Sequence, residues 1–271
     1  MNYVGKTSDI TSISSKADYE AVTRVRDLRG TQIGKLPQVT IYKGNLLSAE
    51  EVLGLEHEHV VIATGSRWRR DGVGLTNRSA VNIHSAAQIL TPDDLMDGRF
   101  PDRGPVVIFD DDHYYIGGVL AEQLRDRNLA MRLVTPGHTV SKYSEASLEA
   151  ANILTRMREL GVQLSVHTNL VRVAQNELIL QCRLSGETDS VAAAAVVLVT
   201  SREPVQLLYQ ELISEPQRLT DSGIRSVSVV GDAKVPGTIA AAAFDGHRYA
   251  RELEGEAVDV AALPPSTRTL Y

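Results

Sequence analysis

The sequence predicts an α/β fold in which mostly parallel sheets are flanked by helices and one region forms a β-meander. Short apolar runs alternate with amphipathic helical segments along most of the 271 residues, a pattern that indicates strands joined by crossover helices. Two of the apolar runs, within 59–66 and 226–233, end in glycine turns, which suits strands buried in a parallel sheet. Their connections are expected to be right-handed.

The first part of the chain begins with a predicted helix over residues 15–35, whose apolar side chains are spaced for one face. A strand is predicted at 39–44. Ser48 followed by Glu51 forms a capping-box pattern, which predicts the start of a short helix. Residues 69–104 are rich in Gly, Asn, Asp and Pro, and this composition predicts a connection between two domains.

A second series of alternating elements follows, and Leu120 is expected to point inward from its first helix. In the next helix, Leu148, Ala151 and Met157 are expected on one buried side, and Gly161 stands at the usual stop position. The predicted elements are a strand at 106–109, a helix at 113–128, a strand at 130–135, a helix at 144–161, short strands at 162–166, 170–173, 177–184 and 191–198, a strand at 226–233 and a helix at 238–253.

Composition excludes several classes of function. The formal net charge is −6 and the pI is near 5.7, whereas a nucleic-acid partner favours a basic surface. The sequence contains no apolar run of about 18 residues, so no membrane span is expected. The first ten residues are too polar for a signal peptide, and the predicted location is cytoplasmic. A lone cysteine, Cys182, excludes an intramolecular disulfide, a cysteine-held zinc site and an iron–sulfur cluster.

Four motifs occur in a characteristic order: VIATGSRW (61–68), VVIFDDDHYYIGGVLAEQL (106–124), VLVTSR (197–202) and VVGDAKVPGTIAAAAFDGHRYARELE (229–254). In these motifs the chain resembles the C-terminal domains of the trimethylamine, dimethylamine and histamine dehydrogenases. Those enzymes are relatives of 2,4-dienoyl-CoA reductase within the NADH:flavin oxidoreductase class. The resemblance implies Rossmann-like domains of the FAD- and NAD(P)-binding type.

The resemblance also implies a division into two domains. Residues 1–75 and 203–271 would form the remnant of an FAD/ADP-binding-like domain, and residues 76–202 a degenerate NAD(P)-binding-like domain. The enzymes of the family begin with a (β/α)8 barrel that carries FMN and, just beyond it, a cysteine cluster for a 4Fe–4S centre. A barrel takes about 250 residues, so this chain is expected to hold neither FMN nor an iron–sulfur cluster. No glycine-rich nucleotide-binding turn stands before Val39.

The segment after the predicted strand 106–109 is acidic where a dinucleotide-binding turn has glycines. Asp110, Asp112 and Tyr115 take the three glycine places. A carboxylate about 5 Å from a phosphate charge repels it by roughly 3 kcal/mol at an effective dielectric of 20. We therefore expect the chain's own carboxylate to fill the anion site. Because the next strand ends at Thr135 without an acidic residue for a ribose or an arginine for a 2′-phosphate, NAD(P)H binding is not expected.

The acidic and histidine-containing segments do not favour metal binding or catalysis. Residues 110–113 are adjacent in sequence and do not easily face one ion, and aspartates that cap a helix are common. His57 and His59 would share one face of a strand, but a solvated loop before the strand explains them better. His247 fits a packed or partly exposed position on the last helix. The sequence predicts no metal site and no catalytic residue.

Two strand ends remain as candidate cofactor-binding positions. Thr64 and Gly65 end one strand, and Gly231 and Asp232 end another, at the sheet edge where such folds bind ligands. Residues 236–238 then open a helix whose free N–H groups favour anions. In the flavoprotein relatives the matching stretches line the FAD or ADP pocket, so ADP or FAD is the cofactor left open. The alternative is that both glycines only permit tight turns.

Two functions follow from these observations. In the first, the chain is a stand-alone or truncated C-terminal part of an amine-dehydrogenase-like flavoprotein oxidoreductase. It is then not catalytic alone and acts as a scaffold or as the partner of a barrel-bearing subunit. In the second, it is an oxidoreductase component that binds ADP or FAD near Gly65 and Gly231. An exposed sheet edge would also favour a homo-oligomer.

Overall fold

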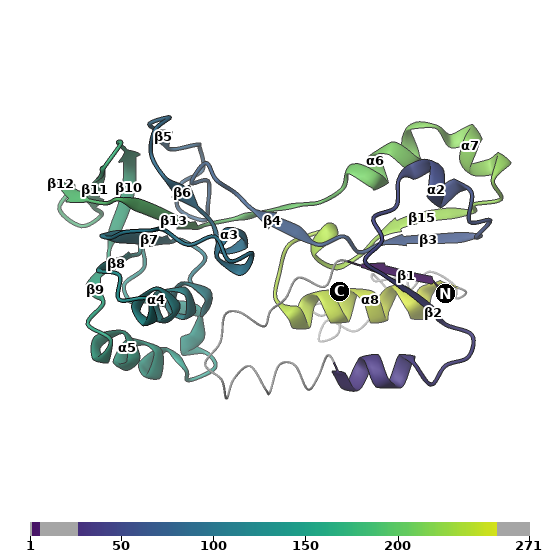
Figure 1. Cartoon of the computed structure of the whole chain (residues 1–271), viewed down its shortest axis with the longest axis horizontal. Coiled ribbons are helices and arrows are strands. Elements are labelled where there is room, and N and C mark those ends of the chain that lie inside the picture. The colour runs from purple at the N-terminus through teal and green to yellow at the C-terminus, as the bar shows by residue number, and fades with distance from the viewer. Residues whose placement is uncertain (1, 6–26, 254–271) are drawn as a thin grey trace, which may run out of the picture. The chain divides into compact units, whose positions relative to one another are not determined.

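The computed structural model describes residues 2–5 and 27–253 (Figure 1). These residues form two compact units, with residues 2–5 divided between them. Unit 1 comprises residues 27–42 and 67–203, and unit 2 comprises residues 43–66 and 204–253. Within the described ranges, no helix has the length and apolar character that crossing a membrane requires.

The chain passes from one unit to the other after Tyr42, after Ser66 and after Glu203. The segments at the last two crossings, β4 (Ser66–Trp68) and β14 (Arg202–Pro204), pair with each other. The crossing after Ser66 lies nine residues before the domain boundary expected after residue 75, and the crossing after Glu203 lies one residue after the boundary expected at 202. Residues 27–42, which were expected in the same domain as residues 43–75, belong to unit 1.

The centre of unit 1 is a five-stranded sheet in which every neighbouring pair of strands is parallel. This arrangement confirms the fold class predicted from the sequence. All residues of two central strands, β7 and β13, are buried, because strands covered on both faces are continuously apolar. In sheet order the strands are β6 (Ile89–Leu90), β13 (Ala195–Val199), β7 (Val106–Asp110), β8 (Met131–Val134) and β9 (Gln163–Ser165).

Successive residues of β7 face two different apolar clusters. Ile108 packs with Leu120, as predicted, in a cluster that the helices cover. Its neighbour Phe109 packs with Leu170 in a cluster covered by the β-meander. The helices are α3 (Pro92–Met96), α4 (Ile116–Asp126) and α5 (Ala150–Glu159). The meander consists of β10 (Thr168–Val173), β11 (Glu177–Cys182) and β12 (Thr188–Ala192), and β5 (Asn82–Ile83) pairs in parallel with β10.

Two sequence-based expectations for unit 1 were wrong. Residues 69–104 are not a connection between domains, since they contain β5, β6 and α3 and bury Leu95 completely. The segment is mostly polar, and its apolar residues are too far apart to show a helical or strand periodicity. The predicted helix 144–161 is a short 3-10 helix, η2 (Lys142–Glu145), followed by α5.

The interruption before α5 lies at Leu148, which has a φ of 62° and is 86% exposed. A left-handed residue ends the regular helical path, so the buried face of α5 starts at Ala150 and does not include Leu148. Ala150 and Met157 are buried, whereas Ala151 is exposed. Gly161 has a positive φ directly after the C-cap, which confirms the predicted stop.

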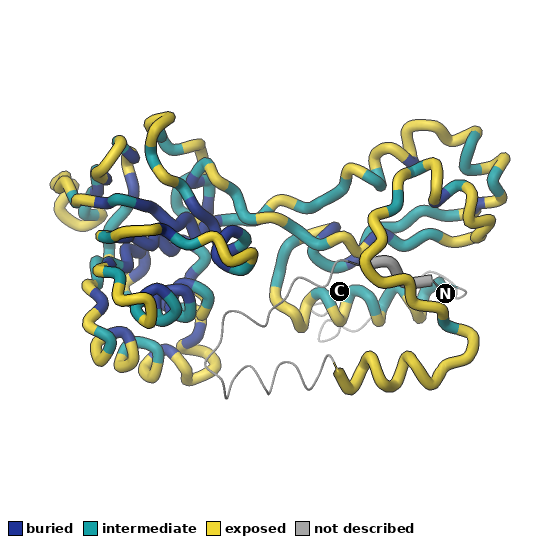
Figure 2. Tube along the Cα trace, viewed as in Figure 1, coloured by how far each residue is buried: buried dark blue, intermediate teal, exposed yellow. Residues whose placement is uncertain are grey.

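Unit 2 is built on two parallel strands, β3 (His59–Ile62) and β15 (Ser226–Val229). Its core is small and centres on Val52, Ile62 and Leu212, and Figure 2 shows much less buried chain here than in unit 1. Its helical segments are α2 (Ala49–Leu53), α6 (Leu207–Ser214), α7 (Pro216–Asp221), η3 (Gly231–Ala233) and α8 (Ile239–Glu252).

The start of α2 confirms the predicted capping box, because the side chain of Ser48 and that of Glu51 bind each other's backbone N–H. Residues 27–33 are helical, and the earlier part of the helix predicted over 15–35 lies outside the described residues. The strand predicted at 39–44 is β2 (Thr40–Lys43), which pairs with β1 (Asn2–Gly5).

Candidate functional site

The carboxyl edge of the unit 1 sheet carries an acidic turn, residues 110–113, between β7 and α4. Asp110, Asp111 and His113 are buried, and His113 has a φ of 67°. One carboxylate oxygen of Asp110 accepts the backbone N–H groups of Asp112 at 3.1 Å and of His113 at 3.0 Å. A side-chain carboxylate thus takes the N–H groups that an anion would otherwise meet at this turn.

The other oxygen of Asp110 lies against the first turn of α4. A Cβ added to Gly117 would stand 2.5 Å from this Oδ2 atom, so only glycine fits there. Oδ2 has no hydrogen-bond partner among the described residues. Asp110 therefore fills the space over the helix start, where the sequence led us to expect a carboxylate in place of a phosphate.

Burial controls the charge of the turn. Burial raises the pKa of Asp110 to about 7, and the neighbouring carboxylates add to this effect. Burial also raises the pKa of Asp112, against the attraction of Arg202. For Asp111, burial acts in the same direction, but hydrogen bonds from the His113 side chain and the Thr76 backbone outweigh it and lower the pKa.

His113 links the acidic turn to the next strand end. Its Nε2 lies 3.3 Å from Oδ1 of Asp111, and its Nδ1 lies 3.3 Å from Oγ1 of Thr135. The order carboxylate, imidazole and hydroxyl is that of a hydrolytic triad. However, all three side chains are at most 1% exposed, and a substrate cannot reach the hydroxyl. The network holds the turn in place.

The described residues contain no group of three or more His, Cys, Asp or Glu side chains arranged to hold a metal ion. Of the histidines considered from the sequence, His59 lies on β3 and its Nδ1 is 2.8 Å from Oγ of Ser226. His247 lies on α8. His57 lies in the exposed loop before β3, as the sequence favoured, whereas His59 belongs to the strand itself. His247 is exposed.

The second candidate site lies at the carboxyl edge of the strand pair in unit 2. Parallel pairing of β3 with β15 brings the two predicted strand ends together. Gly65 and Gly231 both have positive φ, at 79° and 61°, so both use the conformational freedom of glycine. Oγ of Ser66 donates to Oδ2 of Asp232 at 3.1 Å and joins the two ends. Thr64 points elsewhere, since its hydroxyl donates to the carbonyl of Val205.

Carboxylates also satisfy the backbone N–H groups at this edge. Asp232 accepts the N–H of Gly237 at 3.0 Å, and Asp245 of α8 accepts the N–H of Gly231 at 2.9 Å. Burial acts to raise the pKa of Asp245, but the Gly231 N–H and the cations of Arg248 and Lys234 hold it below its usual value. The sequence pattern did not identify Ser66 or Asp245, because each binds a residue from a distant segment.

The chain that carries these two sheet edges is similar to known proteins. Residues 90–195 match the model of the OYE-like second alpha/beta domain. The chain is 32% identical over 254 residues to the dimethylamine dehydrogenase of Hyphomicrobium sp. (strain x), a match that covers 84% of the chain and 34% of that enzyme. The structure of histamine dehydrogenase from Rhizobium sp. 4-9 is 38% identical, with a TM-score of 0.86 over 89% of the chain and 35% of the enzyme.

The chain is a homologue of these amine dehydrogenases. This relationship confirms the resemblance inferred from the motifs. The structure of 6-hydroxypseudooxynicotine amine oxidase from Pseudomonas geniculata N1 is also similar, at 32% identity and a TM-score of 0.83 over 88% of the chain and 35% of that protein. The chain spans about a third of the length of these relatives. The flavoprotein disulfide reductase RclA from Escherichia coli, at 16% identity and a TM-score of 0.53, shares the fold.

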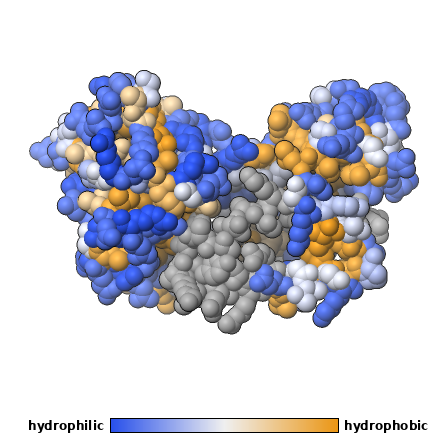
Figure 3. Space-filling view, viewed as in Figure 1, coloured by the Kyte–Doolittle hydropathy of each residue, from blue (hydrophilic) through white to orange (hydrophobic). Residues whose placement is uncertain are grey.

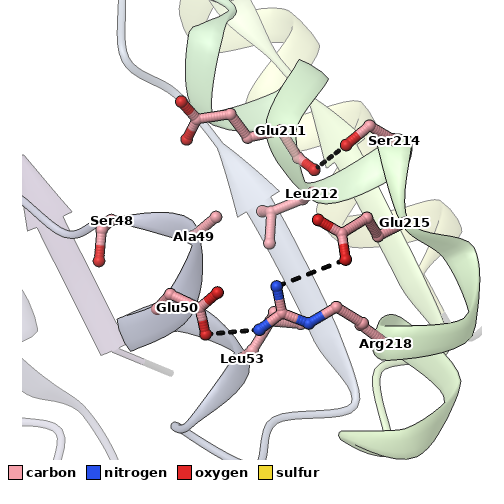
Figure 4. A pocket seen from close by; sticks show the side chains of 9 residues that line it. All are labelled: Ser48, Ala49, Glu50, Leu53, Glu211, Leu212, Ser214, Glu215 and Arg218. Carbon is pink, nitrogen blue, oxygen red and sulfur yellow. Dashed lines mark hydrogen bonds and ion pairs between the residues drawn. The ribbon is translucent and has the colours of Figure 1, made fainter.

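Two surface hollows of this homologue are lined by residues other than those of the two strand edges. In unit 2 a hollow of about 290 Å3 lies between α2 and the α6–α7 segment (Figure 4). Arg218 crosses it and forms ion pairs with Glu50 and, at 3.5 Å, with Glu215. Glu211 adds a further carboxylate, so the lining of the hollow is acidic. In unit 1 a hollow of about 500 Å3 is lined in part by Arg132 and Cys182.

Unit 2 also exposes several large apolar side chains, and Figure 3 shows hydrophobic surface among the charged residues on this unit. Among the described residues α8 contains no buried side chain. The exposed apolar residues of unit 2 include Leu46, Leu55, Leu207, Ile213, Val235, Ile239 and Phe244. A surface of this kind is common where a protein contacts another polypeptide.

Proposed function

We propose that this chain is a non-catalytic module of an amine-dehydrogenase-like flavoprotein oxidoreductase, acting as a scaffold or as the partner of a barrel-bearing polypeptide. One observation carries the proposal. At both sheet edges the chain's own carboxylates, those of Asp110 in unit 1 and of Asp232 and Asp245 in unit 2, accept the backbone N–H groups that would meet a phosphate. Neither edge offers a free set of donors to a nucleotide in this arrangement.

The activity of the purified chain tests this proposal directly. The chain should copurify without flavin absorbance and should reduce no artificial electron acceptor with dimethylamine, histamine, NADH or NADPH as donor. Bound flavin together with acceptor reduction from any of these donors would refute a non-catalytic role.

The partner role needs a separate test. The chain would be mixed with a variant of the Hyphomicrobium dimethylamine dehydrogenase from which the matching third has been deleted. We expect the two proteins to coelute in size-exclusion chromatography. The deleted third of the enzyme, added as a separate fragment, should compete and abolish this coelution. If the two proteins elute separately while the enzyme's own fragment binds, the chain is not a substitute for that part of the enzyme.

A second function is supported by the geometry of unit 2. The strand ends that carry Gly65 and Gly231 are adjacent, and both glycines adopt positive φ, so a nucleotide could approach the backbone closely if Asp232 moved. Thr64, Gly65, Gly231 and Asp232 would then line a site for ADP or FAD. Titration calorimetry with ADP, FAD, NADH and NADPH separates the two functions. Heat with ADP or FAD that disappears in Gly231→Val would favour nucleotide binding, and its absence with all four ligands would favour the scaffold.

A further inference from the structure

The acidic turn, residues 110–113, has no cation paired with its most buried carboxylate. Asp110 is fully buried, and within the described ranges it forms no salt bridge. Its Oδ2 has no hydrogen-bond partner there, although its other oxygen accepts two backbone N–H groups. A buried carboxylate oxygen without a donor is much more costly when it is charged than when it is neutral.

The charged groups around Asp110 increase this cost. Asp111 and Asp112 follow it directly, and both raise its pKa by repulsion. The neighbouring imidazole and guanidinium groups interact with other carboxylates, since His113 faces Asp111 and Arg202 acts on Asp112. From α4 the nearest group is uncharged Gly117, and from β13 the paired residue is Val199.

The turn also supports an aromatic surface. The backbone carbonyl of His113 accepts the N–H of Tyr143 at 3.0 Å, and the two rings meet edge to face at 5.6 Å. Tyr143 in turn lies 5.2 Å from Tyr114, with Lys142 placed 5.1 Å above its ring. Tyr114, Tyr115 and Tyr143 are all exposed, and we call them the tyrosine surface. His113 therefore connects the acidic turn to this surface.

We propose that the acidic turn is a proton-operated latch: one proton held on Asp110 keeps the turn packed against α4, and its loss loosens the turn together with the tyrosine surface. Because the three carboxylates interact, the proton belongs to the turn as a whole, with Asp110 as its main site. The closed turn is most stable under acidic conditions and loses stability as the pH rises.

The size of the effect follows from linkage. Burial raises the pKa of Asp110 to about 7, whereas in an opened, hydrated turn it returns to the ordinary value of 3.8. Between these values the closed turn binds more protons than the open one, so its stability falls as the pH rises. The same two values predict that the equilibrium constant for opening increases about tenfold between pH 6 and pH 8.5.

Amide hydrogen exchange of the full chain, followed by mass spectrometry, tests the latch. After correction for the intrinsic effect of pH, peptides that cover 111–118 and 141–147 should exchange about tenfold faster at pH 8.5 than at pH 6, in proportion to the opening constant. In Asp110→Asn, which cannot ionise, the excess should vanish. Asp93→Asn is the matched control, since Asp93 is another unit 1 carboxyl whose pKa burial raises, and it should keep the full excess.

Two results would overturn the proposal: no excess exchange in the wild-type chain, or an excess that persists in Asp110→Asn. If that variant does not fold, the wild-type chain still decides the question. Carbon-13 titration of the aspartate carboxyls should then show one resonance with a midpoint near neutrality. This resonance should persist in Asp93→Asn, because it does not arise from Asp93. A chain in which every aspartate titrates below about pH 5 has no such latch.

Discussion

The contact between Asp110 and Gly117 provides the most direct test of how the acidic turn is built. Gly117→Ala places a methyl group 2.5 Å from Oδ2 and 2.9 Å from Cγ of Asp110, well inside van der Waals contact. The carboxylate cannot move away easily, because it is fully buried and its other oxygen holds two backbone N–H groups. Overpacking of this kind costs about 1–3 kcal/mol, while the change from Gly to Ala within a helix returns about 0.5–1 kcal/mol.

We therefore expect Gly117→Ala to destabilise the wild-type chain by about 1–2 kcal/mol. In an Asp110→Ala background the nearest remaining atom is the Cβ at 3.2 Å, so the same substitution should be neutral or stabilising by up to about 1 kcal/mol. The double-mutant cycle should thus give a coupling of about 1–3 kcal/mol.

Urea unfolding followed by the fluorescence of Trp68 measures these values. Trp68 is the single tryptophan and packs against the main cluster of unit 1, so its signal reports this unit. Gly246→Ala in α8 is the control, because an added Cβ there meets nothing within 4 Å, and circular dichroism should show no loss of stability. An equal effect of Gly117→Ala in both backgrounds would refute the direct contact.

Three further predictions concern single side chains. Ser48→Ala removes one half of the capping box of α2 and should lower the stability of unit 2 by about 1 kcal/mol in thermal unfolding; no change would mean that the helix does not depend on its cap. Burial acts to raise the pKa of Asp94, but hydrogen bonds from Arg99 and Arg70 hold it below 3.8, so the stability that Asp94 contributes is present above about pH 4 and is lost as the pH falls further. Asp94→Asn should cost about 1–3 kcal/mol at pH 7 and much less at pH 3 in urea titrations, and an equal cost at both values would contradict the ion pairs. Gly161→Ala places a Cβ at a φ of 66° and should destabilise unit 1 by about 1–2 kcal/mol, as measured at Trp68.

Local patterns determined a large part of the fold. The apolar runs of β7 and β13 predicted buried parallel strands, and every residue in both is buried. The Ser48 capping pattern and the stop at Gly161 were also predicted, because each depends on residues that are close in sequence. The error at Leu148 has the opposite origin: its spacing suits a continuous helix, but its left-handed conformation depends on how the chain packs around it.

The sequence by itself determined that β7 ends in an acidic turn rather than a glycine-rich one, since this depends only on residue identity and spacing. Only the tertiary structure decided which donors the carboxylates meet. Ser66 reaches Asp232, and Asp245 reaches the N–H of Gly231, because β3 and β15 pair and α8 returns beside them. Likewise, burial brings Asp110 close to neutral pKa. Such effects depend on distances between segments and on the exclusion of water, which periodicity in the sequence does not record.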